Sequence, residues 1–218
     1  LSTVLLAAPC PKIVCPAMNT GMYENVATQA NLKVLTERGI AVMEPASGEL
    51  ACGTTGAGRL PEVPEIIAYL ERFTAQREGD MRGLKVLVTA AGTREPIDPV
   101  RFVGNRSSGK MGYSIARQAL LRGADVSLIT GPSALTPPPY AKVVKVETTK
   151  QMLDACLAAY PDTDIVIKAA AVADFKPRSV ADQKIKKVHP EDGMTIVMDQ
   201  NPDILKTLGS MKKQQFLV

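Results

Sequence analysis

Apolar and polar residues alternate in distinct blocks along the first 80 residues. Residues 3–8, 12–15 and 40–43 are short apolar runs, which are typical of buried strands. From residue 24 to residue 38, apolar side chains instead recur at every third or fourth position, which predicts an amphipathic helix. Gly39 follows at once, and glycine is the residue that most often ends a helix.

A glycine-rich stretch and a second amphipathic segment complete this part of the chain. Residues 51–60 predict a loop, and residues 64–76 carry apolar side chains on one helical face. The polar stretch at 79–83 has the composition of a linker. We therefore predict a first domain over residues 1–78 and a second domain over residues 84–218.

Strands and helices alternate more regularly in the second domain. Strands are predicted at 85–90, 126–130, 143–146 and 164–170, and helices at 113–122 and 149–160. Such alternation is typical of a parallel, doubly wound sheet. Residues 214–218 resemble the opening of another buried strand, and we expect a fragment truncated at both ends. The predicted fold class is α/β, with two doubly wound, Rossmann-like parallel-sheet units, both incomplete.

Overall composition argues against several classes of protein. A hydrophobic content of 45% and a charged content of 22% are ordinary for a globular chain, and no run of 18 apolar residues predicts a membrane span. The four cysteines form neither a C-x-x-C motif nor a paired framework, which indicates a reducing, cytoplasmic compartment. The single histidine, His189, argues against a histidine-rich metal site or a Ser-His-Asp triad.

Charge is divided unevenly between the two domains. Residues 1–80 contain six basic and nine acidic side chains, whereas residues 81–218 contain 20 and 13. A basic second domain suits an anionic small molecule such as a nucleotide or phosphoester. Because the chain has no arginine-rich run interleaved with aromatic residues, a nucleic-acid partner is the weaker interpretation.

The stretch 104–112 is the strongest candidate for chemistry. Its glycines and serines lie at a strand-to-helix junction, where backbone N–H groups can surround an anion. Gly104, Gly109 and Lys110 match the Walker A spacing, but Met111 stands where that motif needs Ser or Thr to bind magnesium. The plain alternative is an exposed connection. Four cations in one transition favour phosphate binding: Arg94, Arg101, Arg106 and Lys110.

Two further stretches of the second domain carry candidate chemistry. Asp174 follows the predicted strand at 164–170, and its carboxylate suits a metal ion or a ribose hydroxyl, although a helix N-cap is equally consistent. Residues 184–187 contain three lysines. They are either a solvated run of charges or a segment in which one lysine amine stabilises a phosphate during adenylyl-type transfer.

In the first domain, one cysteine differs from the others in its setting. Cys52 lies beside Gly53 in the glycine-rich loop and is expected to be exposed, whereas Cys15 and Cys156 are expected in the core. An exposed thiol can donate a proton or act as a nucleophile. Considered alone, however, Cys52 is more simply a small loop residue.

Taken together, the motifs resemble two enzyme families. Pro-Ala-Met-Asn-x-x-Met at 16–22, Ala-Cys-Gly at 51–53 and Gly-x-Gly-Arg-Leu-Pro at 56–61 resemble the second half of the flavoprotein domain of phosphopantothenoylcysteine decarboxylase. Motifs at 89–101, 105–112, 170–175, 184–187 and 201–203 resemble phosphopantothenate–cysteine ligase, in that family's order. The chain thus resembles the middle of the bifunctional bacterial enzymes of coenzyme A biosynthesis, in which decarboxylase precedes ligase.

The resemblance implies a ligase reaction with small-molecule partners. CTP and Mg²⁺ activate the carboxylate of 4′-phosphopantothenate to an acyl-cytidylate, and the amine of cysteine then displaces CMP. By family role, Asn105 handles the acyl-cytidylate, Lys184 stabilises the transferring phosphate, and Asp174 holds the cation. The implied nucleotide contacts are Gly92, Ser107, Ser108, Gly109, Ala173, Asp174, Phe175, Lys184 and Asp203.

The resemblance also implies a decarboxylase that uses FMN. Asn19 is expected to bind the substrate carboxylate, Met22 and Arg59 to contact the substrate, and Cys52 to donate a proton in the last reduction. Thr54 departs from the acidic residue that usually follows Ala-Cys-Gly in this family. The family's first half, with its catalytic histidine and most FMN contacts, is expected to be missing, as is the end of the ligase.

Assembly and activity of this chain are expected to follow from the same resemblance. The family implies homo-oligomers, with a ligase dimer and a flavoprotein trimer. The chain alone is predicted not to decarboxylate and to ligate poorly. Two alternatives stay open. The first is a nicotinamide-dependent reductase, because residues 86–92 resemble the opening of such folds, although the chain lacks a G-x-G-x-x-G motif. The second is a non-catalytic flavin- or nucleotide-binding regulator.

Overall fold

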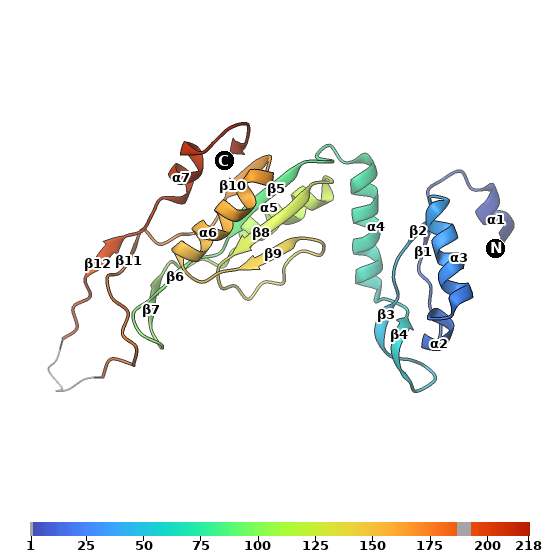
Figure 1. The fold of residues 1–218 in the computed structure, drawn as a ribbon, viewed down its shortest axis with the longest axis horizontal. Helices are drawn as coiled ribbons and strands as arrows, with labels where there is room; N and C mark the ends of the chain where they lie inside the picture. The colour runs from blue at the N-terminus through green and yellow to red at the C-terminus, as the bar shows by residue number, and fades with distance from the viewer. Residues whose placement is uncertain (1, 187–192) are drawn as a thin grey trace. The chain divides into compact units, whose positions relative to one another are not determined.

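The computed structural model describes residues 2–186 and 193–218, which pack as two units (Figure 1). Unit 1 is Leu1–Glu71 and unit 2 is Arg72–Val218. The division falls inside helix α4 (Val63–Glu78), ahead of the predicted linker at 79–83. Asp80, a residue of that predicted linker, is bonded inside unit 2, where Arg122 Nε donates a hydrogen bond to its Oδ1 at 2.9 Å. The assignment of domains to 1–78 and 84–218 stays a prediction.

Unit 1 consists of short elements. In order they are α1 (Ser2–Ala7), β1 (Ile13–Val14), α2 (Thr20–Tyr23), α3 (Val26–Glu37), β2 (Ala41–Val42), β3 (Ala46–Glu49), β4 (Thr55–Arg59) and the first part of α4. Strands β1 and β2 pair in parallel, and β3 and β4 form an antiparallel pair. Asn25 caps α3 by accepting a hydrogen bond from Ala27 N, and Gly39, with a φ of 79°, follows its end.

Two sequence-based predictions for unit 1 are wrong. Residues 3–8 were expected to form a strand, but Ser2–Ala7 is the helix α1. A short apolar run fits either structure, and only a pairing partner makes it a strand. Residues 51–60 were expected to form a loop, but Thr55–Arg59 is β4. Glycine weakens a strand by its backbone entropy, yet Gly58 cannot be larger, because a Cβ there would lie 2.1 Å from the Met18 carbonyl oxygen.

Unit 2 is built on a five-stranded sheet in which every pair is parallel. Its strands are β5 (Lys85–Ala90), β8 (Asp125–Thr130), β9 (Lys142–Lys145), β10 (Ile165–Lys168) and β13 (Phe216–Leu217), in the order β13-β10-β5-β8-β9. Strand order therefore reverses between β5 and β10. That reversal is the switch point at which doubly wound sheets bind ligands.

Helices cover both faces of this sheet. On one face, α5 (Lys110–Leu121) packs over a cluster of Val86, Val88, Ala90, Tyr113, Ala116, Ala119, Leu120, Ala124, Val126 and Leu128. On the other, α6 (Thr149–Ala159) and α7 (Ile204–Ser210) pack over Leu87, Ile129, Met152, Cys156, Tyr160, Val166, Ile204 and Leu208. The residues of β5 alternate between the two clusters, as the pleat of a strand requires.

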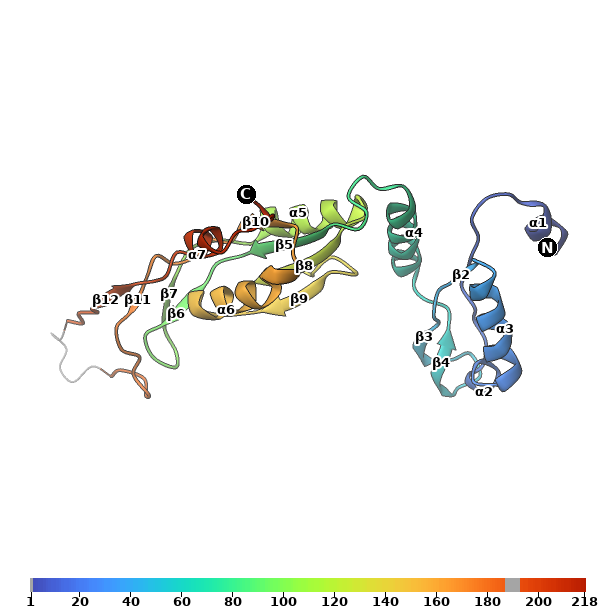
Figure 2. The same cartoon turned by 45° about the horizontal axis from the view of Figure 1, so that its top comes forward.

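Two small antiparallel pairs extend the carboxyl end of the sheet. They are β6 (Arg94–Pro96) with β7 (Phe102–Gly104), and β11 (Phe175–Pro177) with β12 (Met198–Gln200). Both pairs project from the same end in Figures 1 and 2, and β6 contacts β11. The 3-10 turn η1 (Tyr160–Asp162) closes α6.

None of the helices in the described part of the chain is long and apolar enough to cross a membrane.

Candidate functional site

The loops after β5 and β10 meet at the switch point of the sheet. Gly92 forms an isolated parallel bridge with Ala171. Ala171 N donates to the Ala91 carbonyl at 2.7 Å, and Thr93 N donates to the Ala171 carbonyl at 3.3 Å. The strand pairing thus continues past the ends of the two strands and holds the candidate residues at one edge.

Asn105 joins these two loops through its side chain. Its Nδ2 donates to the carbonyl of Val172 at 3.1 Å and to that of Ala171 at 3.3 Å, although the residue itself is exposed. Asn105 therefore joins the phosphate-type loop at 104–112 to the stretch that contains Ala173 and Asp174, and both flank the switch point, where doubly wound sheets form their ligand crevice. The predicted catalytic amide and the predicted nucleotide-binding stretch are in direct contact.

Close packing of the backbone explains the glycines of this edge. A Cβ on Gly92 would lie 3.0 Å from the Asn105 carbonyl oxygen, and one on Gly109 would lie 3.1 Å from the Cβ of Ala91. Gly109 is the N-cap of α5 with a φ of 82° and has no side chain to cap the helix, although Lys110 N, the first N–H of α5, donates to Ser108 Oγ at 3.4 Å. Such an N-terminus favours an anion. Ser108 is held by its carbonyl, which accepts from Ser133 Oγ at 2.9 Å.

A buried polar network lies beneath the crevice, and sequence reasoning did not single it out. Glu95, 2% exposed, accepts hydrogen bonds from Thr149 N (2.8 Å) and Thr149 Oγ1 (2.7 Å) at the start of α6. Thr93 Oγ1 lies 3.1 Å from Thr149 Oγ1 and accepts from Ala173 N at 2.9 Å. A buried carboxylate is stabilised by such donors and by the positive end of a helix. The network therefore holds the backbone of Ala173 in place.

Asn201 belongs to the same network. Its Nδ2 donates to the Ala173 carbonyl at 2.9 Å and to Thr149 Oγ1 at 3.2 Å, and its backbone N donates to the Asp174 carbonyl at 2.7 Å. Ala173 is buried, whereas Asp174 and Phe175 are exposed. The backbone of this stretch is therefore rigidly held, and the Asp174 carboxylate is left facing solvent.

Asp203 has a structural partner of its own. It is the N-cap of α7, where its Oδ1 accepts from Lys206 N at 3.0 Å. The same hydrogen bond is the main cause that lowers the pKa of its carboxyl. A nucleotide-binding role for Asp203 stays a prediction.

The lysine segment is tied to the loop between β6 and β7. Arg101 donates to the carbonyl of Ile185 at 2.9 Å, and Ile185 N donates to Asp98 Oδ2 at 3.1 Å. Lys184 and Lys186 are exposed. Lys187 and His189 lie outside the described residues.

The four cations expected to gather for phosphate are in different environments. Arg94 stacks on the ring of Phe102, with its guanidinium carbon 4.5 Å from the ring centre, and Arg101 pairs with Asp98. Arg106 and Lys110 form no ion pair among the described residues. Met111, at the Walker A magnesium position, is 64% exposed. Of the four cations, only Arg106 and Lys110 therefore have neither an ion pair nor an aromatic ring contact among the described residues.

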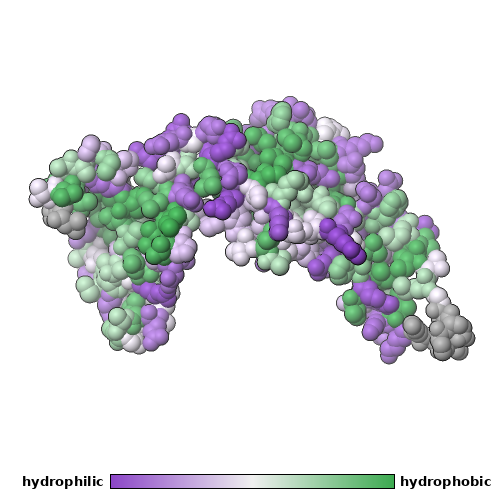
Figure 3. Space-filling model, turned by 180° about the vertical axis from the view of Figure 1, so that it is seen from behind, coloured by the Kyte–Doolittle hydropathy of each residue, from purple (hydrophilic) through white to green (hydrophobic). Residues whose placement is uncertain are grey.

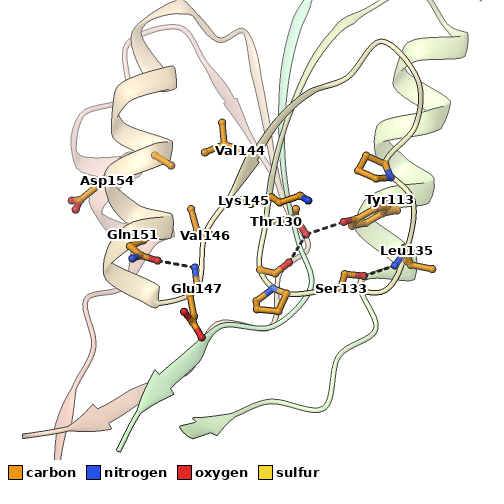
Figure 4. Close-up of a pocket in the computed structure, with 14 residues that line it drawn as sticks. Tyr113, Thr130, Ser133, Leu135, Val144, Lys145, Val146, Glu147, Gln151 and Asp154 are labelled. Atoms are coloured by element: carbon orange, nitrogen blue, oxygen red, sulfur yellow. Dashed lines mark hydrogen bonds between the residues drawn. The ribbon is translucent and has the colours of Figure 1, made fainter. Parts of the chain in front are cut away.

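A cavity of about 760 Å³ opens at the carboxyl ends of β8 and β9 (Figure 4). Figure 4 shows Tyr113 directed at Thr130, whose hydroxyl lies 3.3 Å from the phenol oxygen. The cavity walls include Tyr113, Thr130, Ser133, Lys145, Glu147 and Asp154. Its volume is within the range of small-molecule sites, although sequence reasoning named none of these residues as site residues.

In unit 1, two polar side chains contact the sulfur atom of Cys52. Asn19 Nδ2 donates to Cys52 Sγ at 3.1 Å, and Thr54 Oγ1 lies 3.2 Å from the same sulfur. Hydrogen bonding from Thr54 first, and from Asn19 after it, lowers the pKa of the exposed Cys52 thiol. Of the other cysteines, Cys156 is buried, as predicted, but Cys15 is only half-buried.

The two remaining candidates of unit 1 do not join this group by any hydrogen bond or ion pair among the described residues. Arg59 is paired with Glu62, and Met22 is 60% exposed. Asn19 is also the N-cap of α2, where its Oδ1 accepts from Gly21 N at 2.8 Å. An anion that binds Arg59 must therefore compete with Glu62.

The parallel sheet and its strand order give unit 2 a Rossmann-like fold. Residues 81–218 match the family of the DNA/pantothenate metabolism flavoprotein C-terminal domain, and the chain belongs to this family. Residues 1–75 match the flavoprotein family.

Similar proteins agree with the family. The chain is 44% identical over 215 residues to the coenzyme A biosynthesis bifunctional protein CoaBC of Vibrio vulnificus, covering 99% of this chain and 53% of that protein. It is 46% identical over 220 residues to the protein of that name from Bacillus subtilis, covering 100% and 54%. The chain thus spans about half the length of these relatives.

A solved structure gives the same result for the fold. The crystal structure of the C-terminal domain of a coenzyme A biosynthesis bifunctional protein CoaBC superposes with a TM-score of 0.54 at 47% identity. It covers 62% of this chain and 63% of that one. The α/β fold class with a parallel Rossmann-like sheet is confirmed.

Proposed function

We propose that this chain carries residues of two steps of coenzyme A biosynthesis: a CTP-dependent ligase in unit 2 and part of an FMN-dependent decarboxylase in unit 1. Membership of the family and the names of the relatives support this proposal. In the ligase step, a carboxylate oxygen of 4′-phosphopantothenate forms a bond to the α-phosphorus of CTP, and pyrophosphate leaves. The amine of cysteine then attacks the acyl carbon, and CMP leaves.

The single observation that carries the ligase proposal is the contact of Asn105 with the carbonyls of Ala171 and Val172. It brings the amide, the glycine-rich loop and the stretch at 173–175 to one crevice edge. A nucleotide in this crevice would have the start of α5 near its phosphates and the backbone of Ala173 and Phe175 near its base. Lys184 would supply positive charge while the phosphate transfers, when that charge lowers the barrier most.

The divalent cation of this reaction fits a site completed by the nucleotide. Among the described residues, no group of three or more His, Cys, Asp or Glu side chains is placed to hold a metal ion. Asp174 nevertheless offers an exposed carboxylate at the crevice, and Mg²⁺ in nucleotide sites takes one or two carboxylates together with phosphates. Asp174 would hold the ion, which would neutralise charge on the triphosphate.

For the decarboxylase step, unit 1 offers the group of Asn19, Cys52 and Thr54. Bound FMN would supply the oxidation and reduction of the substrate. Asn19 would bind the substrate carboxylate, and Cys52 would deliver a proton, with Met22 and Arg59 as further substrate contacts. Because Asn19 already donates to the Cys52 sulfur, a substrate carboxylate at Asn19 would lie beside the thiol.

We also propose a cytoplasmic protein that forms homo-oligomers. All four cysteines are free, which agrees with a reducing compartment. The oligomers expected from the family resemblance are a dimer for the ligase part and a trimer for the flavoprotein part. Sedimentation of the chain measures this directly.

Ligand-dependent melting tests the ligase proposal against the reductase alternative. A ligand that binds only the native state raises the melting temperature. We expect CTP with Mg²⁺ to raise that of unit 2, and NADPH to leave it unchanged. If NADPH raises it and CTP does not, the ligase proposal is wrong and the reductase interpretation takes its place.

A further inference from the structure

Asp98 is a buried carboxylate that the proposed reaction does not yet use. It lies in the loop between β6 and β7, and its side chain is 0% exposed. Burying a carboxylate is costly unless hydrogen bonds and an opposite charge compensate it. Its two oxygens have separate sets of partners, which divide its role in two.

The first oxygen shapes the loop. Oδ1 accepts the backbone N–H groups of Val100 at 2.9 Å and Arg101 at 2.8 Å. A side chain that accepts from the backbone two and three residues later closes a turn. This half of the carboxylate is occupied by local structure.

The second oxygen reaches a segment 87 residues away in sequence. Oδ2 accepts from Ile185 N at 3.1 Å and from Arg101 Nε at 2.9 Å. Arg101 also donates to the Ile185 carbonyl at 2.9 Å, so both backbone polar groups of Ile185 are held. The guanidinium of Arg101 keeps the pKa of Asp98 well below its usual range, and the carboxylate stays charged.

A second anchor holds the same segment a few residues earlier. Ala181 N donates to the Ile97 carbonyl at 3.0 Å. Lys184 lies between the two anchors, and its exposed side chain forms no ion pair among the described residues. The backbone around Lys184 is thus held on both sides, while no described residue forms an ion pair with its amine.

We propose that Asp98 is a positioning residue for Lys184. It fixes the backbone at Ile185, so that the amine of Lys184 starts from one place and loses less freedom when it binds the transferring phosphate. The inference rests on the proposed function, in which Lys184 stabilises that phosphate. Asp98 itself touches neither nucleotide nor acyl group in this role.

The variant Asp98→Asn separates the two halves of the carboxylate. The remaining oxygen can still accept the N–H groups of Val100 and Arg101, which keeps the turn. The amide nitrogen then faces the N–H of Ile185 and the guanidinium of Arg101, which are donors like itself. The matched control is Asp154→Asn, which removes a carboxylate paired with Lys150 on the surface of α6.

Tryptic cleavage of the native chain tests whether Asp98 holds the backbone at Ile185, and it does not depend on the ligase reaction. We expect cleavage of the bond between Lys184 and Ile185, followed by mass spectrometry, to become roughly tenfold faster in Asp98→Asn, as for loss of a charged hydrogen bond. Asp154→Asn is expected to cleave at the wild-type rate. Equal cleavage of wild type and Asp98→Asn overturns the proposal. Arg101→Lys, which loses the paired donors to Asp98, serves if Asp98→Asn does not fold.

The rate of pyrophosphate release from CTP tests whether Asp98 positions Lys184 for the reaction. In the full-length protein, Asp98→Asn is expected to lower kcat of that step roughly tenfold while KM for CTP changes little. In a Lys184→Ala background, Asp98→Asn is expected to cause no further loss, since both act on one group. Independent, additive losses overturn the proposal. The proposed function fails separately, if the wild-type protein releases no pyrophosphate, and the cleavage result does not depend on it.

Discussion

At the scale of residues, chemistry here depends on contacts between side chains far apart in sequence. Cys52 was predicted to be exposed from its glycine neighbours, and it is. Its hydrogen bond from Asn19 joins residues 33 positions apart, and no local pattern predicts such a contact. The same holds for Asn105 and Val172. Sequence reasoning therefore proposed candidate residues without their partners.

Thr54 is expected to tune the Cys52 thiol. Because hydrogen bonding from Thr54 lowers the pKa of Cys52, Thr54→Val should raise that pKa, and Thr54→Ser should restore it. The thiolate then forms, and alkylation by iodoacetamide accelerates, only at higher pH. The measurement is the alkylation rate of Cys52 against pH, with exposed Cys10 as the internal reference. An unchanged profile in Thr54→Val would show that Thr54 has no such role.

Asn105→Asp is expected to separate the two ligase half-reactions. Asn105 donates to two carbonyls, and a carboxylate in its place repels them and the nearby phosphate. Acyl-cytidylate should still form but react with cysteine on the order of 100-fold more slowly, as for loss of one stabilising donor. Chromatography of the intermediate measures this. Asn25→Asp at the N-cap of α3 is the control, since aspartate caps equally well. Product formation at the normal rate would remove Asn105 from its assigned role.

At the scale of elements, close approach of α5 to β5 builds the crevice edge. Helix α5 was predicted to begin near residue 113, but it begins at Lys110, so the glycine-rich stretch supplies its first turn. Gly112 lies in that turn, and a Cβ there would be 2.5 Å from the Cβ of Ala90. Helical spacing of apolar residues does not detect such a turn, because its glycine carries no apolar side chain.

Two glycines in helices of unit 2, Gly112 and Gly209, form a matched pair that tests this packing. Gly112→Ala should destabilise the fold by about 1–3 kcal/mol, because the added methyl overpacks against Ala90. Gly209→Ala in α7 meets nothing within 4 Å and should stabilise by up to about 1 kcal/mol through helix propensity. Urea unfolding measures both free energies. A loss of equal size in both variants would contradict the packing argument.

At the scale of the whole molecule, the two units differ in how much they bury. Unit 2 has an apolar cluster on each face of its sheet, whereas Met43 is the one hydrophobic side chain of unit 1 that is buried among the described residues. Hydrophobic surface is visible on unit 1 in Figure 3. The exposed large apolar side chains of unit 1 include Val4, Leu6, Val26, Leu60, Ile67 and Leu70. By itself, this unit does not enclose its thiol site.

The chain tested alone is therefore expected not to decarboxylate. Cys52 is exposed, and the only histidine of the chain lies in the second domain and not beside the thiol loop in sequence. Incubated with FMN and 4′-phosphopantothenoylcysteine, the chain should yield no 4′-phosphopantetheine by mass spectrometry. Cys52→Ala gives the background. Product above that background would contradict the prediction.

By itself, the sequence determined the five strands of the central sheet, the helices α5 and α6, and the α/β class. It predicted neither the pairs β6–β7 and β11–β12 nor the helix α7, and the roles of its candidate residues stay predictions. Periodicity and glycine placement are local properties, and they define local structure. Only the tertiary structure decided that strand order reverses between β5 and β10, that Asn105 contacts Val172 at this reversal, and that Asp98 holds Ile185. These are contacts between distant parts of the chain. Backbone pairing and burial select them, and no local pattern encodes them.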